Sequence, residues 1–95
     1  MDYKVVIIED DPTSAKIIEL TLQKLKYNII GIARTGEEGY DLALSSDPDI
    51  ILMDINLPGE WDGITTTERI KKVRDIPVIY ITANSEDTTL NRAVS

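Results

Sequence analysis

The stretch DIILMDINLPGEWDG, residues 49–63, places a carboxylate directly after a run of four apolar residues. The run from Ile50 to Met53 shows no apolar and polar alternation, which is typical of a strand covered on both faces. Asp54 then stands at the end of that strand, and ligands of open parallel sheets bind beyond the carboxyl ends of the strands. This stretch therefore predicts an α/β fold with a site at Asp54.

The rest of the chain continues an alternation of strands and helices. Apolar runs predict further strands at residues 4–8, 28–35 and 76–82. Helical spacing and capping residues predict helices that begin at residue 12, that span 36–46 and 63–74, and that run from residue 85 to the end of the sequence. The order βαβαβαβα predicts a three-layer, doubly wound parallel sheet with right-handed crossovers.

The helix boundaries rest on specific residues. Asp11 before Pro12 is typical of an N-cap followed by a proline in the first turn, and Asp62 can cap the helix at 63–74. Gly39 weakens the helix at 36–46 by about 1 kcal/mol. Thr65–Thr67 give the third helix a low intrinsic helix propensity. We expect the buried positions to be Ala15, Ile18, Leu22 and Leu25 in the first helix and Ile64, Ile70 and Val73 in the third.

Composition excludes several classes of function. The chain has 95 residues, enough for one small domain, and a net charge of -7 from 17 acidic and 10 basic residues. This charge argues against binding to nucleic acid or to an anionic membrane, and favours a multivalent cation or a basic partner. The absence of cysteine excludes disulfides and thiolate metal sites, and no signal peptide or long apolar run is visible. We expect a soluble cytoplasmic protein.

Oxygen-bearing side chains follow three of the predicted strands. Glu9, Asp10 and Asp11 follow the first strand, Asp54 ends the third, and Thr82 ends the fourth. Each has an ordinary interpretation, because turns after strands are hydrated and Asp11 is explained as a helix cap. Adjacent carboxylates repel one another, however, and a bound cation offsets that repulsion best. Taken together, these residues predict a cation site.

The type of cation follows from the available donors. The sequence contains neither histidine nor cysteine, so carboxylates, a backbone carbonyl, water and phosphate favour Mg2+ and nearly exclude zinc. A carboxylate beside Mg2+ can act as a nucleophile and form an aspartyl phosphate. Thr82 could then donate a hydrogen bond to a phosphoryl oxygen.

Three motifs resemble those of one family. The segments VVIIEDDP at 5–12, DIILMDINLPGEWDGI at 49–64 and PVIYITA at 77–83, in this order and spacing, look like the receiver domain of two-component response regulators. The resemblance runs through the whole chain. It implies a flavodoxin-like sheet whose strands lie in the order 2-1-3-4-5, of which this sequence holds the first four.

The resemblance also implies residue roles. Asp54 corresponds to the residue that accepts a phosphoryl group from a histidine kinase or a phosphotransfer protein. Asp10 corresponds to a direct ligand of Mg2+, and Glu9 to a partner that acts mainly through water. Asn56 would offer its backbone carbonyl to the metal. Phosphorylation would then control an output domain or a downstream protein, so that the chain catalyses only its own phosphorylation and dephosphorylation.

Three further residues have family counterparts or stand out. Thr82 corresponds to the hydroxyl residue whose shift towards the phosphate is part of the activation switch. Asn84 occupies a position that tunes autodephosphorylation, although we favour a plain helix-flanking role. Trp61, in a loop one residue longer than the common LPxxDG form, is expected to cover the start of the third helix rather than to bind a partner.

The sequence departs from the family at its end. It stops before a fifth strand and helix, so the family's phosphate-binding lysine cannot be assigned, and neither Lys4 nor Arg34 stands where it could replace that lysine. We therefore expect residues 1–95 to be a partial receiver domain. The strand at 76–82 would be an exposed edge, which favours a dimer or a strand-exchanged assembly.

Three alternatives remain at this point. A degenerate receiver could act as a protein-interaction module without phosphorylation. A phosphatase of the haloacid dehalogenase class would need a second aspartate two residues after the nucleophile, where Asn56 stands. A flavin-binding flavodoxin would need a phosphate loop rich in hydroxyl groups and glycine, whereas EDDP would repel phosphate.

Overall fold

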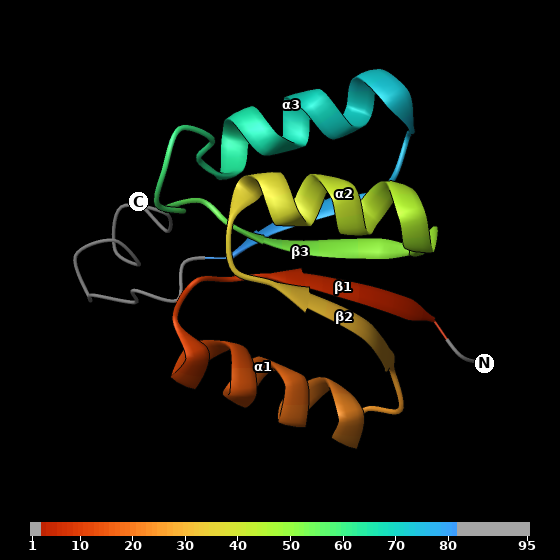
Figure 1. Cartoon of the computed structure of the whole chain (residues 1–95). Coiled ribbons are helices and arrows are strands. Elements are labelled where there is room, and N and C mark those ends of the chain that lie inside the picture. Colours follow the sequence, from red (N-terminus) through yellow and green to blue (C-terminus); the bar gives the residue numbers. More distant parts are fainter. Residues whose placement is uncertain (1–2, 82–95) are drawn as a thin grey trace, which may run out of the picture.

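The computed structural model describes residues 3–81 of the chain. Within them, four parallel strands form one sheet in the order β2-β1-β3-β4. The elements are β1 (Lys4–Ile8), α1 (Pro12–Lys24), β2 (Asn28–Ala33), α2 (Gly36–Ser46), β3 (Ile50–Asp54), α3 (Gly63–Val73) and β4 (Val78–Ile81). Figure 1 shows α1 on one face of the sheet and α2 with α3 on the other. The predicted doubly wound α/β fold and the strand order 2-1-3-4 are confirmed.

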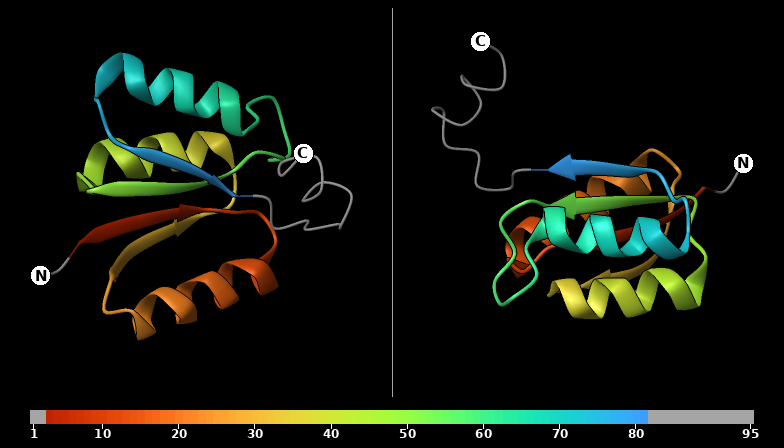
Figure 2. Two further views of the ribbon diagram at one scale, coloured as in Figure 1. Left: turned by 180° about the vertical axis from the view of Figure 1, so that it is seen from behind. Right: turned by 90° about the horizontal axis from the view of Figure 1, so that it is seen from above.

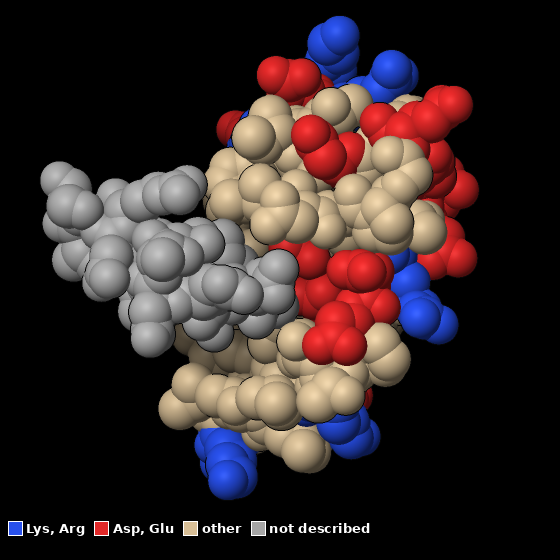
Figure 3. All heavy atoms as spheres, turned by 90° about the vertical axis from the view of Figure 1, so that its left-hand side faces the viewer, with Lys and Arg blue, Asp and Glu red and all other residues tan. Residues whose placement is uncertain are grey.

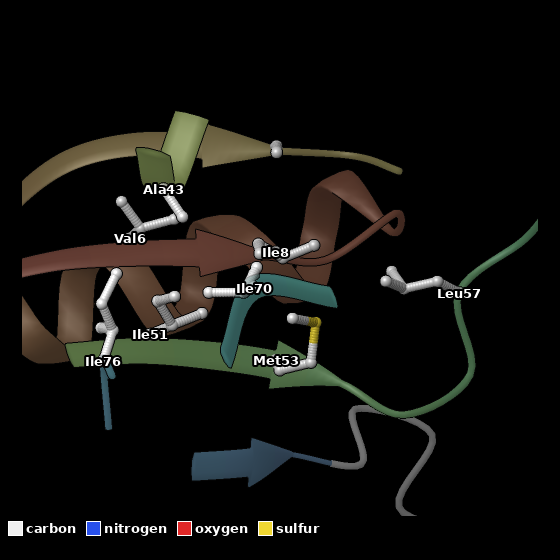
Figure 4. Close-up of a cluster of buried hydrophobic side chains, with 9 residues drawn as sticks. Val6, Ile8, Ala43, Ile51, Met53, Leu57, Ile70 and Ile76 are labelled. Atoms are coloured by element: carbon white, nitrogen blue, oxygen red, sulfur yellow. The ribbon is translucent and has the colours of Figure 1, made fainter. Parts of the chain in front are cut away.

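The main core lies between the sheet and the pair α2 and α3. Side chains from the two central strands meet those of the helices there, as Figure 4 shows. The buried members of this cluster are Val6, Ile8, Ala33, Ala43, Ile51, Met53, Leu57, Ile70 and Ile76. The apolar runs that predicted β1 and β3 are thus buried as expected of central parallel strands.

Gly39 allows α2 to pack closely on the sheet. A Cβ atom at this position would meet the Cδ1 atom of Ile8 and lie 2.8 Å from its Cγ1 atom. The glycine that lowers the helix propensity of this segment is therefore required by close packing against β1.

The predicted buried face of the third helix was wrong at two positions. Ile64 is 48% exposed and Val73 is 57% exposed, whereas Ile70 is fully buried as predicted. The buried face consists instead of Gly63, Thr66, Thr67 and Ile70. The Oγ1 atoms of Thr66 and Thr67 donate hydrogen bonds to the carbonyls of Asp62 (2.7 Å) and Gly63 (2.8 Å). Because their hydroxyl groups are satisfied within the helix, these small side chains can be buried.

Two other expectations need correction at the ends of elements. Leu25, expected on the buried face of the first helix, is 61% exposed because α1 ends at Lys24 and Leu25 is its C-cap. The strand expected at 28–35 ends at Ala33, because Thr35 is the N-cap of α2 and accepts a hydrogen bond from the Glu38 N–H at 3.1 Å.

The strand β4 lies at the edge of the described sheet, as the right-hand view of Figure 2 shows. It pairs with β3 through Val78 to Ile81, and Ile79 and Tyr80 are 51% and 42% exposed. The predicted last residue of this strand, Thr82, and the predicted helix from Ser85 lie outside the described residues. Among residues 3–81, the structure has no helix whose length and apolarity would allow it to cross a membrane.

Candidate functional site

The acidic residues predicted after β1 and β3 meet at the carboxyl end of the sheet. Ile8 pairs with Met53, so the next residues along the two strands, Glu9 and Asp54, are neighbours. Glu9, Asp10 and Asp54 each place one carboxylate oxygen within 4.8 Å of the others. Figure 3 looks onto this end of the molecule, where acidic side chains gather in the middle of the face.

Glu9 is the most deeply buried of the three acids, with 1% of its surface exposed. Its backbone N–H donates to the carbonyl of Ala33 at 2.9 Å, and its Oε2 atom accepts a hydrogen bond from the Asp11 N–H at 3.0 Å. Its Oε1 atom is buried and has no hydrogen-bond partner among the described residues. A buried oxygen without a partner is unfavourable unless a ligand or water satisfies it.

Burial raises the pKa of the Glu9 carboxyl from 4.5 to about 7. The hydrogen bond from the Asp11 N–H opposes this rise, while the carboxyl groups of Asp54 and Asp10 add to it. Negative charge is therefore unfavourable at this site, and a cation would reverse that effect.

Asp54 is held at the tip of β3 with only 5% of its surface exposed. Its Oδ1 atom accepts a hydrogen bond from the Asn56 N–H at 3.0 Å, which fixes the orientation of the carboxylate. Its backbone carbonyl lies against Gly63, the first residue of α3, where an added Cβ would meet that oxygen. Gly63 also donates its N–H to the carbonyl of Ile55 at 3.0 Å. The position of the Asp54 carboxylate is therefore fixed by the end of β3, by the turn at Asn56 and by the start of α3.

Asn56 and Thr82 complete the predicted set of site residues. Among the described residues, no donor forms a hydrogen bond with the Asn56 carbonyl, so this oxygen is available to a ligand. Thr82 lies outside the described residues, as does Asn84.

Arg34 stands at the rim of the site, although the sequence analysis gave it no role. Its Nη2 atom lies 3.5 Å from the carbonyl oxygen of Asp10. Both residues line a hollow of about 310 Å3 together with Thr35, Glu38 and Pro58. The signal that could have found it is the strand order, because β2 lies beside β1 and their carboxyl ends are neighbours.

The donor set is suited to a hard metal ion. Three carboxylates converge, one buried oxygen lacks a partner, and the sequence supplies neither histidine nor cysteine. Such oxygen ligands suit Mg2+, Ca2+ or Mn2+ rather than zinc. The site can therefore hold a divalent cation next to a fixed carboxylate.

Comparisons with known proteins give a consistent result. The family model described as "Response regulator receiver domain" matches residues 5–95. The signal receiver domain of a modulated diguanylate cyclase from Desulfovibrio desulfuricans G20 is 35% identical with a TM-score of 0.82, over 97% of this chain and 74% of that one. The response regulator PhyR from Brucella abortus is 37% identical with a TM-score of 0.80, over 87% of this chain and 34% of that one.

A third similar structure contains a partner protein. PhyR from Bartonella quintana, crystallised with the anti-sigma factor NepR, is 36% identical with a TM-score of 0.77. The match covers 84% of this chain and 33% of that PhyR chain. This chain thus spans about a third of the length of the two PhyR proteins.

Proposed function

Because this chain belongs to the response regulator receiver domain family, a family of signalling modules rather than catalytic enzymes, we propose that it accepts a phosphoryl group on Asp54. The observation that carries this proposal is the arrangement around Asp54. Its buried carboxylate is oriented by the Asn56 N–H and lies beside Glu9 and Asp10. A nucleophile held on rigid elements loses little freedom when it reacts, which favours the transfer.

The transfer uses one oxygen of the Asp54 carboxylate as the nucleophile. Oδ1 accepts the Asn56 N–H, and Oδ2 makes no hydrogen bond with the described residues. An oxygen of this carboxylate attacks the phosphorus of a phosphohistidine on a sensor kinase or phosphotransfer protein. A P–O bond forms and the P–N bond breaks, and the imidazole nitrogen keeps the electron pair and takes a proton from water. Thr82 is proposed to donate its hydroxyl to a phosphoryl oxygen.

We assign the cation of this site as Mg2+. Asp10 and Asp54 are proposed as direct ligands, with Glu9 acting through water and Asn56 through its backbone carbonyl. When bound, Mg2+ would neutralise charge on the phosphoryl oxygens. The three acids would hold the positive charge of the cation beside the nucleophilic carboxylate. The Oε1 atom of Glu9, which has no hydrogen-bond partner among the described residues, supports the assignment.

The signal is proposed to leave through protein contacts. PhyR from Bartonella quintana was crystallised with NepR, and this chain is similar to that PhyR. We propose that phosphorylation of Asp54 biases a conformational equilibrium of this domain and so controls an attached output domain or a separate downstream protein.

Mass spectrometry of the intact protein tests the phosphoacceptor directly. The wild type, Asp54→Asn and Asp41→Asn are incubated with acetyl phosphate, with and without Mg2+. Asp41 is an exposed acid of α2 that makes no hydrogen bond or ion pair with the described residues, so it serves as a matched control. We expect the mass of one added phosphoryl group on the wild type and on Asp41→Asn, only with Mg2+, and no adduct on Asp54→Asn. An adduct of equal yield on Asp54→Asn, or none on the wild type, would overturn the proposal and favour a phosphorylation-independent interaction module.

A further inference from the structure

A hollow of about 260 Å3 lies between α2 and α3, and none of its lining residues belongs to the acidic site. Its lining residues are Tyr40, Trp61, Arg69, Lys72 and Val73, which we call the α2–α3 hollow. The rings of Tyr40 and Trp61 meet edge to face, with centroids 5.6 Å apart and planes at 87°. The guanidinium carbon of Arg69 lies 4.5 Å from the centroid of the Trp61 ring. Aromatic rings and a stacked arginine thus form one wall of the hollow.

Trp61 is held in place by the start of α2. A Cβ atom on Gly36 would lie 2.7 Å from the Trp61 carbonyl oxygen and 2.8 Å from its Cβ. The backbone of Trp61 therefore packs against the start of α2, and its ring contacts Tyr40 of α2 and Arg69 of α3. Trp61 is half-buried, and tryptophan, tyrosine and arginine are enriched among the residues that contribute most to binding at protein interfaces.

The cations of the hollow have no acidic partner within the described part of the chain. Lys71 and Arg74, also on or next to α3, pair with Asp75 at 3.7 Å and Asp47 at 3.1 Å. Arg69 and Lys72 make no ion pair with the described residues. Although the net charge of the chain is -7, these two cations beside an aromatic wall form a local positive patch that favours an anionic ligand.

The apolar part of the hollow indicates what kind of anion fits. Val73, which is 57% exposed, lines the hollow together with the half-buried rings of Tyr40 and Trp61. A highly charged polyanion such as nucleic acid would be repelled by the acidic chain more strongly than a short acidic peptide, and it would leave Val73 uncovered. An acidic peptide with an apolar side chain satisfies both parts of the surface.

We propose that the α2–α3 hollow docks an acidic segment of a partner protein. One apolar side chain of that segment packs against Tyr40, Trp61 and Val73, and its carboxylates face Arg69 and Lys72. This inference goes beyond the phosphoacceptor role and does not depend on phosphorylation of Asp54. The small volume of the hollow accommodates few side chains, so the contact is a weak or accessory one.

A peptide titration tests the proposal. The probe is a capped peptide with two leucines flanked on both sides by glutamates, compared with a serine-for-leucine version and a lysine-for-glutamate version. Binding to the full chain is followed by the indole N–H resonance of Trp61, the only tryptophan. The variant Arg69→Gln/Lys72→Gln is compared with Lys16→Gln/Lys24→Gln, which removes the same charge from α1 on the opposite face of the sheet.

The expected pattern is specific to both charge and apolar contact. The glutamate and leucine peptide shifts the Trp61 resonance, and the serine and lysine versions bind more weakly. Loss of two exposed charge contacts weakens the affinity of Arg69→Gln/Lys72→Gln about five- to thirtyfold, while Lys16→Gln/Lys24→Gln binds within about twofold of the wild type. Equal weakening in both variants would indicate net charge alone and overturn the proposal. No shift with the acidic peptide, or a larger shift with an RNA oligonucleotide or anionic lipid vesicles, would also overturn it.

Discussion

Replacing Glu9 with glutamine should stabilise the metal-free protein at neutral and alkaline pH. Burial raises the pKa of Glu9 from 4.5 to about 7, so the folded state binds more protons than the unfolded state between these values. The stability that protonated Glu9 contributes is therefore complete below about pH 4.5 and is lost as the pH rises through about 7. Glutamine cannot ionise, and its amide oxygen can still accept the Asp11 N–H that Glu9 Oε2 accepts.

The size of the effect follows from the pKa values. Each pKa unit corresponds to about 1.4 kcal/mol, so the rise from 4.5 to about 7 corresponds to an upper limit of about 3 kcal/mol. Glu9 itself is buried, but the neighbouring Asp10 is partly exposed, so water and ions screen the part of this energy that comes from its charge. We expect Glu9→Gln to be more stable than the wild type by about 1 to 3 kcal/mol at about pH 8, and by much less at about pH 5.

Urea denaturation in the presence of a chelator measures this difference. The wild type, Glu9→Gln and Glu60→Gln are unfolded at about pH 5 and about pH 8. Glu60 is an exposed loop residue with no hydrogen bond or ion pair to the described residues, so its variant changes the net charge alone. Adding Mg2+ at the higher pH should raise the stability of the wild type more than that of Glu9→Gln, because the cation offsets the buried charge. The reasoning is refuted if the stability of Glu9→Gln falls between the two pH values as steeply as that of the wild type.

The remaining predictions concern backbone packing, capping and association. Gly63→Ala should destabilise the protein by about 1 to 3 kcal/mol in urea denaturation, because its Cβ would lie 2.8 Å from the Ile55 Cα and meet the Asp54 carbonyl. Gly59→Ala, in open space at a φ of 88°, should cost about 1 to 2 kcal/mol through backbone strain alone, and it should leave the yield of phosphorylated Asp54 unchanged. Thr35→Ala removes the cap of α2 and should lower the unfolding free energy by about 1 kcal/mol. Ile79→Lys on the edge strand β4 should reduce self-association in light scattering at high protein concentration, and a wild type that is monomeric with cooperative unfolding would contradict the expected dimer or strand-exchanged assembly.

The sequence predicts the two central strands well because the apolar pattern and the burial agree there, whereas the strand order 2-1-3-4 was implied by the resemblance to receiver domains. The unbroken apolar runs at 4–8 and 50–53 gave the two central strands, and parallel pairing of β1 with β3 then brings Glu9 beside Asp54. The helix at 36–46 was also predicted with its observed bounds. Local signals decide where these strands and this helix lie, but the pairing of β1 with β3 is a non-local feature that the family resemblance supplied.

The third helix shows why apolarity alone was insufficient. Its isoleucine and valine positions predicted a face that included Ile64 and Val73, both of which are exposed. The helix instead places Thr66 and Thr67 against the protein interior, since their hydroxyl groups bond to carbonyls one turn earlier. A pattern that scores threonine as polar cannot detect this, because the hydrogen bonds that permit burial form only within the helix.

The position of Asp54 depends on the same unpredicted packing of α3. Gly63 begins the helix, leaves no room for a side chain against the Asp54 carbonyl, and bonds to the carbonyl of Ile55. The turn between β3 and α3 is thereby fixed at both ends, and within it the Asn56 N–H holds Oδ1 of Asp54. A movement of α3 relative to the sheet would disturb this turn, and under the proposed function we expect a phosphoryl group on Asp54 to act on the turn in return. Because Trp61 belongs to the same turn and contacts both Tyr40 and Arg69, the turn links the α2–α3 hollow to Asp54 along the chain.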